Sequence, residues 1–318
     1  MIEVLQSLRM RALPVRWLVW ALLPMIVGAA PARAADEIQI GVGIDPAYTA
    51  IFIADHEKLF EKAGLNVKVV QYTQGGDALD ALVAHQVTMV GSAEPTSLIR
   101  MVRADVRAVA VFSQSGTYIK FTARPGITDP RKMTKFGIVP GSVSEFSTEK
   151  LFQKYGIDQK SVQLIKAGPP EFPALLARGD VDGYFLWEPW PTIGVAQGGK
   201  VLMTSGDVGY VYNMWLDVDG AWLASHKAET LSVVRVLKSA CDIAQKDPSR
   251  AAAANQAEVK IPPAQTLKLL QDVQCEVRDF TPQDMKTYGE IADFLYAHKI
   301  TPIRADVGKY IDVGFYKP

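Results

Sequence analysis

The chain has 318 residues, of which 48% are hydrophobic, and its 34 basic and 34 acidic residues give no formal net charge at pH 7. This length and apolar content suffice for a sizeable core divided between two lobes. The lack of a basic excess argues against a nucleic acid as partner.

Residues 1–34 have the pattern of a secretory signal peptide. An arginine-rich start precedes an apolar run of 14 residues, 17–30, and Ala32-Arg33-Ala34 then forms a small-x-small cleavage site. The run falls short of the ~20 residues that cross a bilayer, and a retained N-terminal anchor is the alternative. We therefore expect an exported chain that is cleaved after Ala34 or Ala35.

The residues that follow alternate between expected strands and helices. The strands are expected at 37–44, 66–71, 87–90 and 107–112, and the helices at 50–63, 77–84 and 96–103. This alternation with short turns is typical of an α/β protein that has a parallel sheet with helices on both faces.

A second alternating set follows an extended segment, 118–123, and long helices end the chain. Strands are expected at 136–139, 162–165, 181–185 and 201–203, further extended segments at 214–218 and 221–223, and helices at 226–246, 249–258, 263–274, 281–298 and 303–313. We infer two αβ lobes joined by two crossover segments, with a helical C-terminal tail. The first lobe takes residues 35–122 and 216–318, and the second takes 123–215.

The turns after the expected strands are the candidate binding site. Ligands bind outside the carboxyl ends of parallel strands, and those ends should face one another across a cleft between the lobes. The turns concerned are 43–48, 75–76, 91–95, 141–145 and 187–190. The candidate ligand-binding residues on them are Asp45, Tyr48, Ser92, Glu94, Ser142, Val143, Ser144, Glu145, Trp187 and Glu188.

The stretch 135–146 has the clearest binding pattern. A short apolar strand runs into Pro140-Gly141, and a helix that Gly156 ends comes next. Ser142 or Ser144 is suited to cap this helix, and the exposed amides of its first turn attract a small anion or a carbonyl oxygen. The alternative is an ordinary capped helix.

Acidic residues dominate the expected cleft turns. They are Asp45, Glu94, Glu145 and Glu188, and no Lys or Arg stands among them. The acids predict acceptors for amino or ring N–H groups of a ligand, while the helix start predicts donors to an oxygen-rich end. Simple helix capping is the alternative explanation for the acids. Flat apolar walls are expected from Tyr48, Phe146, Tyr184, Trp187, Trp190 and Trp215.

Motifs of common enzymes are missing from the sequence. It has no GxSxG elbow, HExxH motif, P-loop or CxxC motif, and its four histidines are scattered over expected helices. Such residues do not form the clusters that hold a metal or carry nucleophilic catalysis. We therefore expect no catalytic residue, no metal site and no cofactor.

Two cysteines, Cys241 and Cys275, lie 34 residues apart in the helical C-terminal part. In an exported chain an even pair is more often a disulfide than two free thiols, which remain the alternative.

Several stretches of the sequence resemble the periplasmic solute-binding proteins of ABC importers in the nitrate/sulfonate/taurine group, which are related to thiamine-pyrimidine-precursor-binding proteins. The resemblance is carried by residues 47–54, 64–67, 91–95, 141–146 and 176–190. It implies a type II periplasmic-binding fold, a monomer in the periplasm that closes on a small molecule, and delivery of that molecule to the membrane subunits of an ABC permease.

The resemblance also implies binding roles for Tyr48, Ser92, residues 142–144, and Trp187 with Glu188. Taurine- and alkanesulfonate-binding relatives usually have Ala-His where this chain has Ser144-Glu145, which leaves the ligand open. A binding protein for a thiamine-pyrimidine precursor is one alternative, and a sensory receptor domain is another.

An enzyme on the same scaffold, of the desulfinase or pyrimidine-synthase type, is a further alternative to the binding protein. A desulfinase needs a nucleophilic cysteine at a cleft turn, whereas both cysteines of this chain stand in the helical tail.

Overall fold

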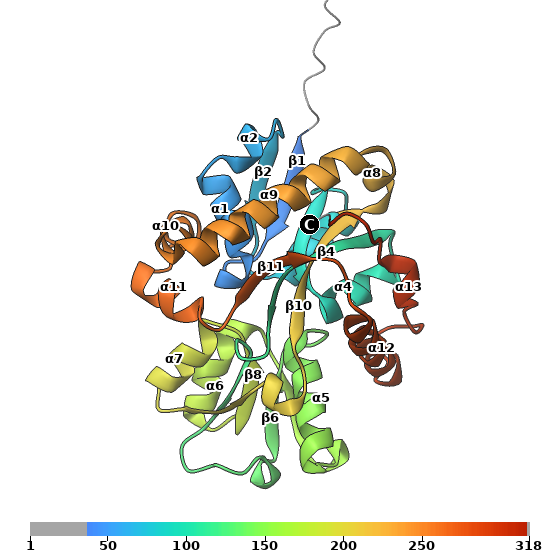
Figure 1. Cartoon of the computed structure of the whole chain (residues 1–318). Helices are drawn as coiled ribbons and strands as arrows, with labels where there is room; N and C mark the ends of the chain where they lie inside the picture. The colour runs from blue at the N-terminus through green and yellow to red at the C-terminus, as the bar shows by residue number, and fades with distance from the viewer. Residues whose placement is uncertain (1–36, 317–318) are drawn as a thin grey trace, which may run out of the picture. The chain divides into compact units, whose positions relative to one another are not determined.

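The computed structural model describes residues 37–316, so the expected signal peptide and its cleavage site lie outside the described residues. The described residues form two β-sheets with helices packed around them (Figure 1). None of the helices in this part of the chain is both long and apolar enough to cross a bilayer.

The large sheet has six strands in the order β11-β4-β10-β3-β1-β2. They are β1 (Ile38–Val42), β2 (Val67–Gln71), β3 (Met89–Ala93), β4 (Val106–Ser115), β10 (Tyr212–Asp219) and β11 (Gln274–Arg278). Strands β3, β4 and β10 are buried along nearly their whole length, as expected for central strands that are covered on both faces.

The small sheet has five strands in the order β7-β6-β8-β5-β9. They are β5 (Lys120–Ala123), β6 (Lys135–Ile138), β7 (Gln163–Lys166), β8 (Gly183–Leu186) and β9 (Lys200–Thr204). Three helices pack on this sheet, α5 (Val143–Tyr155), α6 (Phe172–Arg178) and α7 (Trp190–Ala196), and α6 also packs against α7. Figure 1 shows these elements grouped below the large sheet.

The remaining helices accompany the large sheet. They are α1 (Thr49–His56), α2 (Leu59–Lys62), α3 (Gly75–Val83), α4 (Glu94–Met101), α8 (Gly220–Ser225), α9 (Lys227–Lys246), α10 (Pro248–Val259), α11 (Pro263–Leu269), α12 (Pro282–Ala297) and α13 (Val307–Tyr310). Short 3₁₀ turns occur at η1 (Pro46–Tyr48), η2 (Pro130–Lys132), η3 (Gln159–Ser161), η4 (Pro169–Glu171) and η5 (Gly206–Val208). Helix α9 packs against α1 and α10, and α12 packs against α4.

Both sheets are mixed, which corrects the expectation of purely parallel sheets. β1 is parallel to β2 and β3, but β10 is antiparallel to β3 and β4, and β5 is antiparallel to β8 and β9. The crossovers explain this, because β4 leaves the large sheet toward the small one. The chain returns to the large sheet at the end of the strands from which β4 left it, so β10 runs antiparallel to β4.

Several expected elements differ in the structure. The helix expected at 50–63 is broken into α1 and α2 at Lys58, whose φ of 57° is left-handed. The helix expected at 263–274 ends at Leu269, and Gln274–Arg278 is instead strand β11. Its alternating burial is a strand pattern that the preceding helical spacing concealed.

Two shorter segments near the C-terminal half were also assigned wrongly. Residues 221–223, expected to be extended, belong to helix α8, which Asp219 caps by accepting a hydrogen bond from the Trp222 amide at 2.9 Å. Of the helix expected at 303–313, only α13 forms, and Ile311 instead makes a parallel bridge to Ala108.

The larger of two hydrophobic clusters in the described residues runs from the large sheet into the small one. Phe146 of α5 makes the connection, because its ring packs edge-on against Tyr210 at 4.9 Å and against Phe294 at 5.4 Å between ring centroids. The expected disulfide is confirmed, and it joins Cys241 of α9 to Cys275 of β11. It therefore fixes the longest helix on the edge strand of the large sheet.

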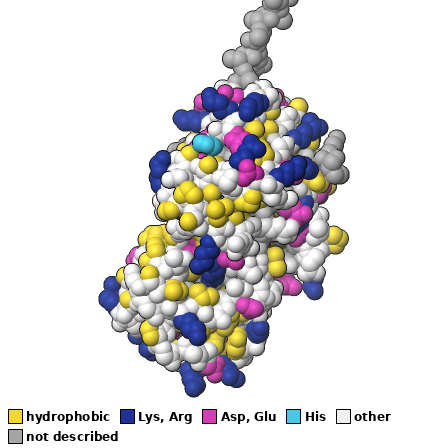
Figure 2. Space-filling view, turned by 60° about the vertical axis from the view of Figure 1, so that its left-hand side comes forward, with side chains coloured by type: hydrophobic (Ala, Val, Ile, Leu, Met, Phe, Trp, Pro, Cys, Tyr) yellow, Lys and Arg dark blue, Asp and Glu magenta, His cyan; other side chains and the backbone are white. Residues whose placement is uncertain are grey.

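The surface carries no dominant charge on the face that Figure 2 presents. Lys and Arg side chains there are interspersed with Asp and Glu, and hydrophobic side chains lie on both sides of the waist between the upper and lower masses.

Candidate functional site

A cavity of about 120 Å³ lies where the carboxyl-terminal ends of strands from both sheets meet. Its wall combines turns after β1, β2, β3, β6 and β8 with both crossover segments. The lining residues are Asp45, Ala47, Tyr48, Gln74, Gly75, Gly76, Asp77, Ser92, Ala93, Thr96, Arg100, Tyr118, Ile119, Val139, Pro140, Gly141, Ser142, Val143, Trp187, Tyr212 and Met214. Of the ten predicted residues, the structure brings Asp45, Tyr48, Ser92, Ser142, Val143 and Trp187 to this wall.

The buried ring of Tyr48 shapes one side of the cavity, and three glycines make room for it. A Cβ atom at Gly43 would lie 2.8 Å from the Tyr48 ring, and one at Gly91 would lie 3.0 Å from it. A Cβ atom at Gly75 would lie 2.8 Å from the Tyr48 hydroxyl oxygen. Side chains at these positions would clash with the ring, so three of the expected turns carry glycine where Tyr48 needs close approach.

Three helix N-termini meet at the cavity wall. α3 begins at Gly75, α4 follows Ala93, and α5 follows Ser142, and all three of these residues line the cavity. No side chain caps the first turn of α3 or of α4. The amides of a first helical turn have no intrahelical partner and carry partial positive charge, so such ends bind anions.

The turn before α5 is held by its own side chains. Ser142 Oγ accepts a hydrogen bond from the Ser144 amide at 3.1 Å and donates one to the Val139 carbonyl at 2.8 Å. Ser144 Oγ accepts from the Val139 amide at 3.2 Å, and Glu145 Oε2 accepts from the Gly141 amide at 2.7 Å. Ser144 and Glu145 thus stabilise the turn through hydrogen bonds to its backbone, and they are not among the residues that line the cavity.

Glu94 also faces away from the cavity, although it was predicted to bind ligand. Its buried carboxyl accepts hydrogen bonds from the Asn213 amide at 3.0 Å and from the Tyr210 hydroxyl at 3.1 Å. Burial raises the pKa of Glu94 to about 8, so the group is largely protonated at neutral pH. It anchors the second crossover to the start of α4.

Glu188 is likewise occupied by the protein. Its side chain is 2% exposed, and its carboxylate accepts from Lys120 Nζ at 3.0 Å and from the Thr192 amide at 3.2 Å. Lys120 also forms an ion pair with Asp272 at 2.8 Å. This triad joins the small sheet to the segment before β11.

Asp45 is the predicted acid that does reach the cavity. Its Oδ1 accepts hydrogen bonds from the Ala47 amide at 2.9 Å and from the Tyr118 hydroxyl at 3.1 Å. Burial raises the pKa of Asp45 to about 6, partly opposed by these two hydrogen bonds. Asp77, in the first turn of α3, was not predicted and also lines the wall.

Arg100 is a basic residue of the cavity wall that lies outside the strand-end turns, so the expectation that those turns carry no Lys or Arg still holds. It lines the cavity from the last turn of α4, where its Nε and one terminal nitrogen bind the Asp80 carboxylate at 3.0 and 2.9 Å. The prediction considered only the turns. Ala93, Thr96 and Arg100 stand at helical spacing on one face of α4, a pattern that could have revealed the arginine.

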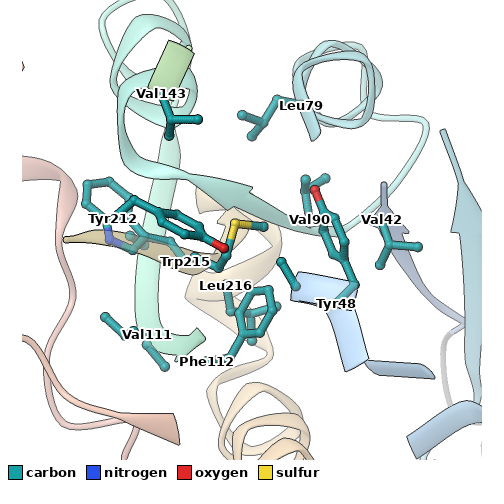
Figure 3. Packing of buried hydrophobic residues seen from close by; sticks show 14 of the residues in the cluster. Val42, Tyr48, Leu79, Val90, Val111, Phe112, Val143, Tyr212, Trp215 and Leu216 are labelled. Atoms are coloured by element: carbon teal, nitrogen blue, oxygen red, sulfur yellow. The ribbon is translucent and has the colours of Figure 1, made fainter. Parts of the chain in front are cut away.

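Aromatic residues of both crossovers complete the wall. Tyr118 and Tyr212 stack with ring centroids 6.3 Å apart, and neither was predicted to contact ligand. Figure 3 shows Tyr212 and Tyr48 on opposite sides of a group that also includes Val143. Trp215, a predicted wall, is instead fully buried and donates from Nε1 to the Tyr288 hydroxyl at 3.1 Å.

The described part of the chain has no set of side chains arranged to bind a metal cofactor. Within residues 37–316, no group of three or more His, Cys, Asp or Glu side chains is placed to hold a metal ion. The cavity lining contains neither His nor Cys. The arrangement offers amide and hydroxyl donors, one guanidinium group and carboxylate acceptors, which suit reversible binding of a small polar molecule.

The sequence and the fold of this chain are similar to those of periplasmic binding proteins. The model of the NMT1-like family matches residues 32–259. A putative aliphatic sulfonates-binding protein of Bacillus subtilis (strain 168) is 23% identical over 292 residues, which cover 88% of this chain and 87% of that protein. The taurine-binding periplasmic protein of Escherichia coli (strain K12) is 23% identical over 189 residues, or 58% of each chain.

Solved structures agree on the fold. The periplasmic aliphatic sulphonate binding protein SsuA from Escherichia coli superposes with a TM-score of 0.77 at 16% identity, covering 86% of this chain and 97% of its own. A mutant of DszB in complex with biphenyl-2-sulfinic acid gives a TM-score of 0.65 at 13% identity, covering 88% and 97%. The predicted periplasmic-binding fold and the predicted resemblance are thereby confirmed.

Proposed function

The chain belongs to the NMT1-like family, and from this premise we propose that it is an extracytoplasmic solute-binding protein of an ABC importer. It captures a small organic molecule with an anionic group, of the sulfonate or taurine type, in the cavity between the two sheets. The large sheet with its helices forms one lobe and the small sheet with its helices the other, so the lobe boundaries fall before β5 (Lys120–Ala123) and before β10 (Tyr212–Asp219), and not at the expected 122/123 and 215/216. Closure of the lobes traps the ligand.

The observation that carries this proposal is the convergence of three helix N-termini on one cavity. The first turns of α3, α4 and α5 line the same wall, together with the guanidinium group of Arg100. Each N-terminus acts as roughly half a positive charge, so the three ends favour an anionic group over a neutral one. Sulfonate oxygens can accept hydrogen bonds from several such amides at once.

Asp45 is a hydrogen-bond acceptor, in contrast to the amide donors at the helix N-termini, and this favours a ligand that extends beyond its anionic group. An ionised Asp45 beside a compact anion such as nitrate would repel it, which weakens nitrate as the ligand. An organic sulfonate places its anionic group at the helix ends and directs the rest of the molecule elsewhere. The names of the sulfonate- and taurine-binding relatives support the same class.

The residues of the same wall favour binding over catalysis. The lining residues supply no thiol or imidazole, and the two cysteines are joined in a disulfide between α9 and β11. A desulfinase that depends on a cysteine nucleophile would therefore find none at this cavity. We also propose that the protein is a periplasmic monomer that docks on the membrane subunits of its permease. N-terminal sequencing of the exported protein should begin at Ala35 or Asp36.

Calorimetric titration of the ligand-stripped mature protein tests the function. Alkanesulfonates or taurine should bind at one site per chain, and more tightly than nitrate or a thiamine pyrimidine. Arg100→Met should weaken sulfonate binding by about fivefold to tenfold, since one charge-assisted contact is lost. Arg103→Met is the matched control, because Arg103 is exposed and does not line the cavity.

The proposal has two contrary outcomes in this experiment. One is the absence of sulfonate binding by a correctly folded protein, judged by its circular dichroism. The other is equal loss of affinity in the two arginine variants, which would attribute the effect to net charge and not to the cavity.

A further inference from the structure

Tyr212 has a buried hydroxyl without a protein partner at the cavity wall. The residue starts β10, its side chain is 2% exposed, and it lines the cavity. Among residues 37–316, no group forms a hydrogen bond with this hydroxyl. Figure 3 shows the hydroxyl directed across the view toward the side on which Tyr48 lies.

Neighbouring buried tyrosines differ from Tyr212 in this respect. The Tyr118 hydroxyl donates to Asp45 at 3.1 Å, and the Tyr210 hydroxyl donates to Glu94 at 3.1 Å. The Tyr288 hydroxyl accepts from Trp215 Nε1 at 3.1 Å. A buried polar group without a partner is costly, and a ligand in the cavity that Tyr212 lines would supply the missing partner.

The charges around Tyr212 indicate which part of a ligand would meet it. Asp45 lies close enough to add to the burial that raises the pKa of the Tyr212 hydroxyl. Tyr118, which donates to Asp45, stacks on the Tyr212 ring. This edge of the cavity therefore presents acceptors, and an anionic head group is better placed at the three helix N-termini. A hydroxyl or ammonium group suits the edge beside Tyr212.

We propose that Tyr212 determines specificity by hydrogen-bonding the uncharged or cationic polar end of the ligand. The ligand class is then a short sulfonate that carries a hydroxyl or amino group, in preference to a plain alkanesulfonate. This inference rests on the proposed function, because it assumes that a sulfonate occupies the cavity. An alkyl end placed at the same position would leave the Tyr212 hydroxyl unpaired, and the site would reject it.

Three probes of equal size isolate this contact. Propane-1-sulfonate, 2-hydroxyethanesulfonate and 2-aminoethanesulfonate have the same number of non-hydrogen atoms and differ at the end remote from sulfur. The wild type should bind the hydroxy and amino compounds about tenfold more tightly than the propane compound. Tyr212→Phe should bring the three affinities to within about twofold of one another, mainly by weakening the first two.

Thermal unfolding separates this role from a structural one. Tyr212→Phe removes a hydroxyl that bonds nothing in the protein, so the ligand-free variant should keep or raise its melting temperature. Tyr184→Phe is the matched control, since the Tyr184 hydroxyl is buried outside the cavity and donates to the Trp190 carbonyl at 3.2 Å. That variant should lose melting temperature and keep the wild-type ranking of the probes.

The outcomes distinguish the inference from the function on which it rests. Wild-type binding of all three probes with equal affinity, or an unchanged ranking in Tyr212→Phe, overturns the role of Tyr212 and leaves sulfonate binding intact. Failure of the folded wild type to bind any of the three overturns the proposed function and the inference together. Equal wild-type affinities for the three probes need no variant, so this result overturns the inference even if Tyr212→Phe does not fold.

Discussion

The ion-pair triad of Lys120, Glu188 and Asp272 predicts that removing Lys120 destabilises the protein more than neutralising Glu188. Glu188 is 2% exposed, Lys120 18% and Asp272 30%, so the glutamate is the most deeply buried member. Replacing Lys120 with Met removes the common cation and leaves a buried carboxylate with only the Thr192 amide at 3.2 Å. Replacing Glu188 with Gln leaves Lys120 paired with Asp272 at 2.8 Å.

The magnitudes follow from burial. Breaking a fully buried pair costs about 3–5 kcal/mol, because one charge is left uncompensated. The partial exposure of Lys120 and Asp272 lowers this figure, so we expect about 2–3 kcal/mol for Lys120→Met and about 1 kcal/mol for Glu188→Gln. The double variant should cost less than the sum of the single ones, with a coupling of about 1–2 kcal/mol.

Urea unfolding followed by circular dichroism at pH 7 measures all four proteins of this cycle. Ser239→Ala, a substitution of an exposed serine that bonds the Arg235 carbonyl within α9, serves as a control with little effect. The reasoning would be refuted if Glu188→Gln cost as much as Lys120→Met, or if the two costs simply added. Either result would mean that Glu188 is not held by Lys120 in solution.

Three other predictions concern single groups. Glu94 has a pKa of about 8 in the folded protein against 4.5 for the free side chain, so between these pH values the folded protein retains a proton that the unfolded chain loses. The free energy of unfolding should therefore fall as pH rises from about 5 to 8. Glu94→Gln should flatten that slope in urea titrations over the same pH range. Replacing Cys241 and Cys275 together with Ala should lower the free energy of unfolding by about 3–4 kcal/mol, given the 34-residue separation, whereas an unchanged value, or free thiols in denatured wild type, would contradict the bridge. Ser142→Ala removes the cap of α5 and should cost about 1–2 kcal/mol in the same urea assay, and a loss below the error of the measurement would contradict the capping role.

The sequence was most informative where local chemistry determines structure. The Ser142 cap of α5 and the left-handed Gly156 that ends it follow from short-range rules, and both are present. The glycine turns around Tyr48 were found at the carboxyl ends of strands, as parallel topology requires. The crossovers were also predicted, but the antiparallel direction of β10 depends on the end of the strands at which the chain re-enters the large sheet.

The site was harder to predict because the partners of its polar groups lie far away in the sequence. Glu94 bonds Asn213, 119 residues further on, and Glu188 bonds Lys120, 68 residues earlier. Nothing near Glu94 or Glu188 in the chain reveals those contacts, so both acids were interpreted as ligand acceptors. Tyr212 was missed for a related reason, since its unpaired hydroxyl can be recognised only once its surroundings are known.

The most direct test of a sulfonate site at the helix ends is a crystal structure of the mature protein with 2-aminoethanesulfonate. Anomalous scattering from sulfur locates the sulfonate group of the ligand independently of the protein density. The account predicts the sulfonate group within hydrogen-bond distance of the amides that begin α3, α4 or α5, and the amino group on the side of Tyr212. A sulfonate bound outside this cavity, or a cavity that stays free of it at saturating concentration, would contradict the account.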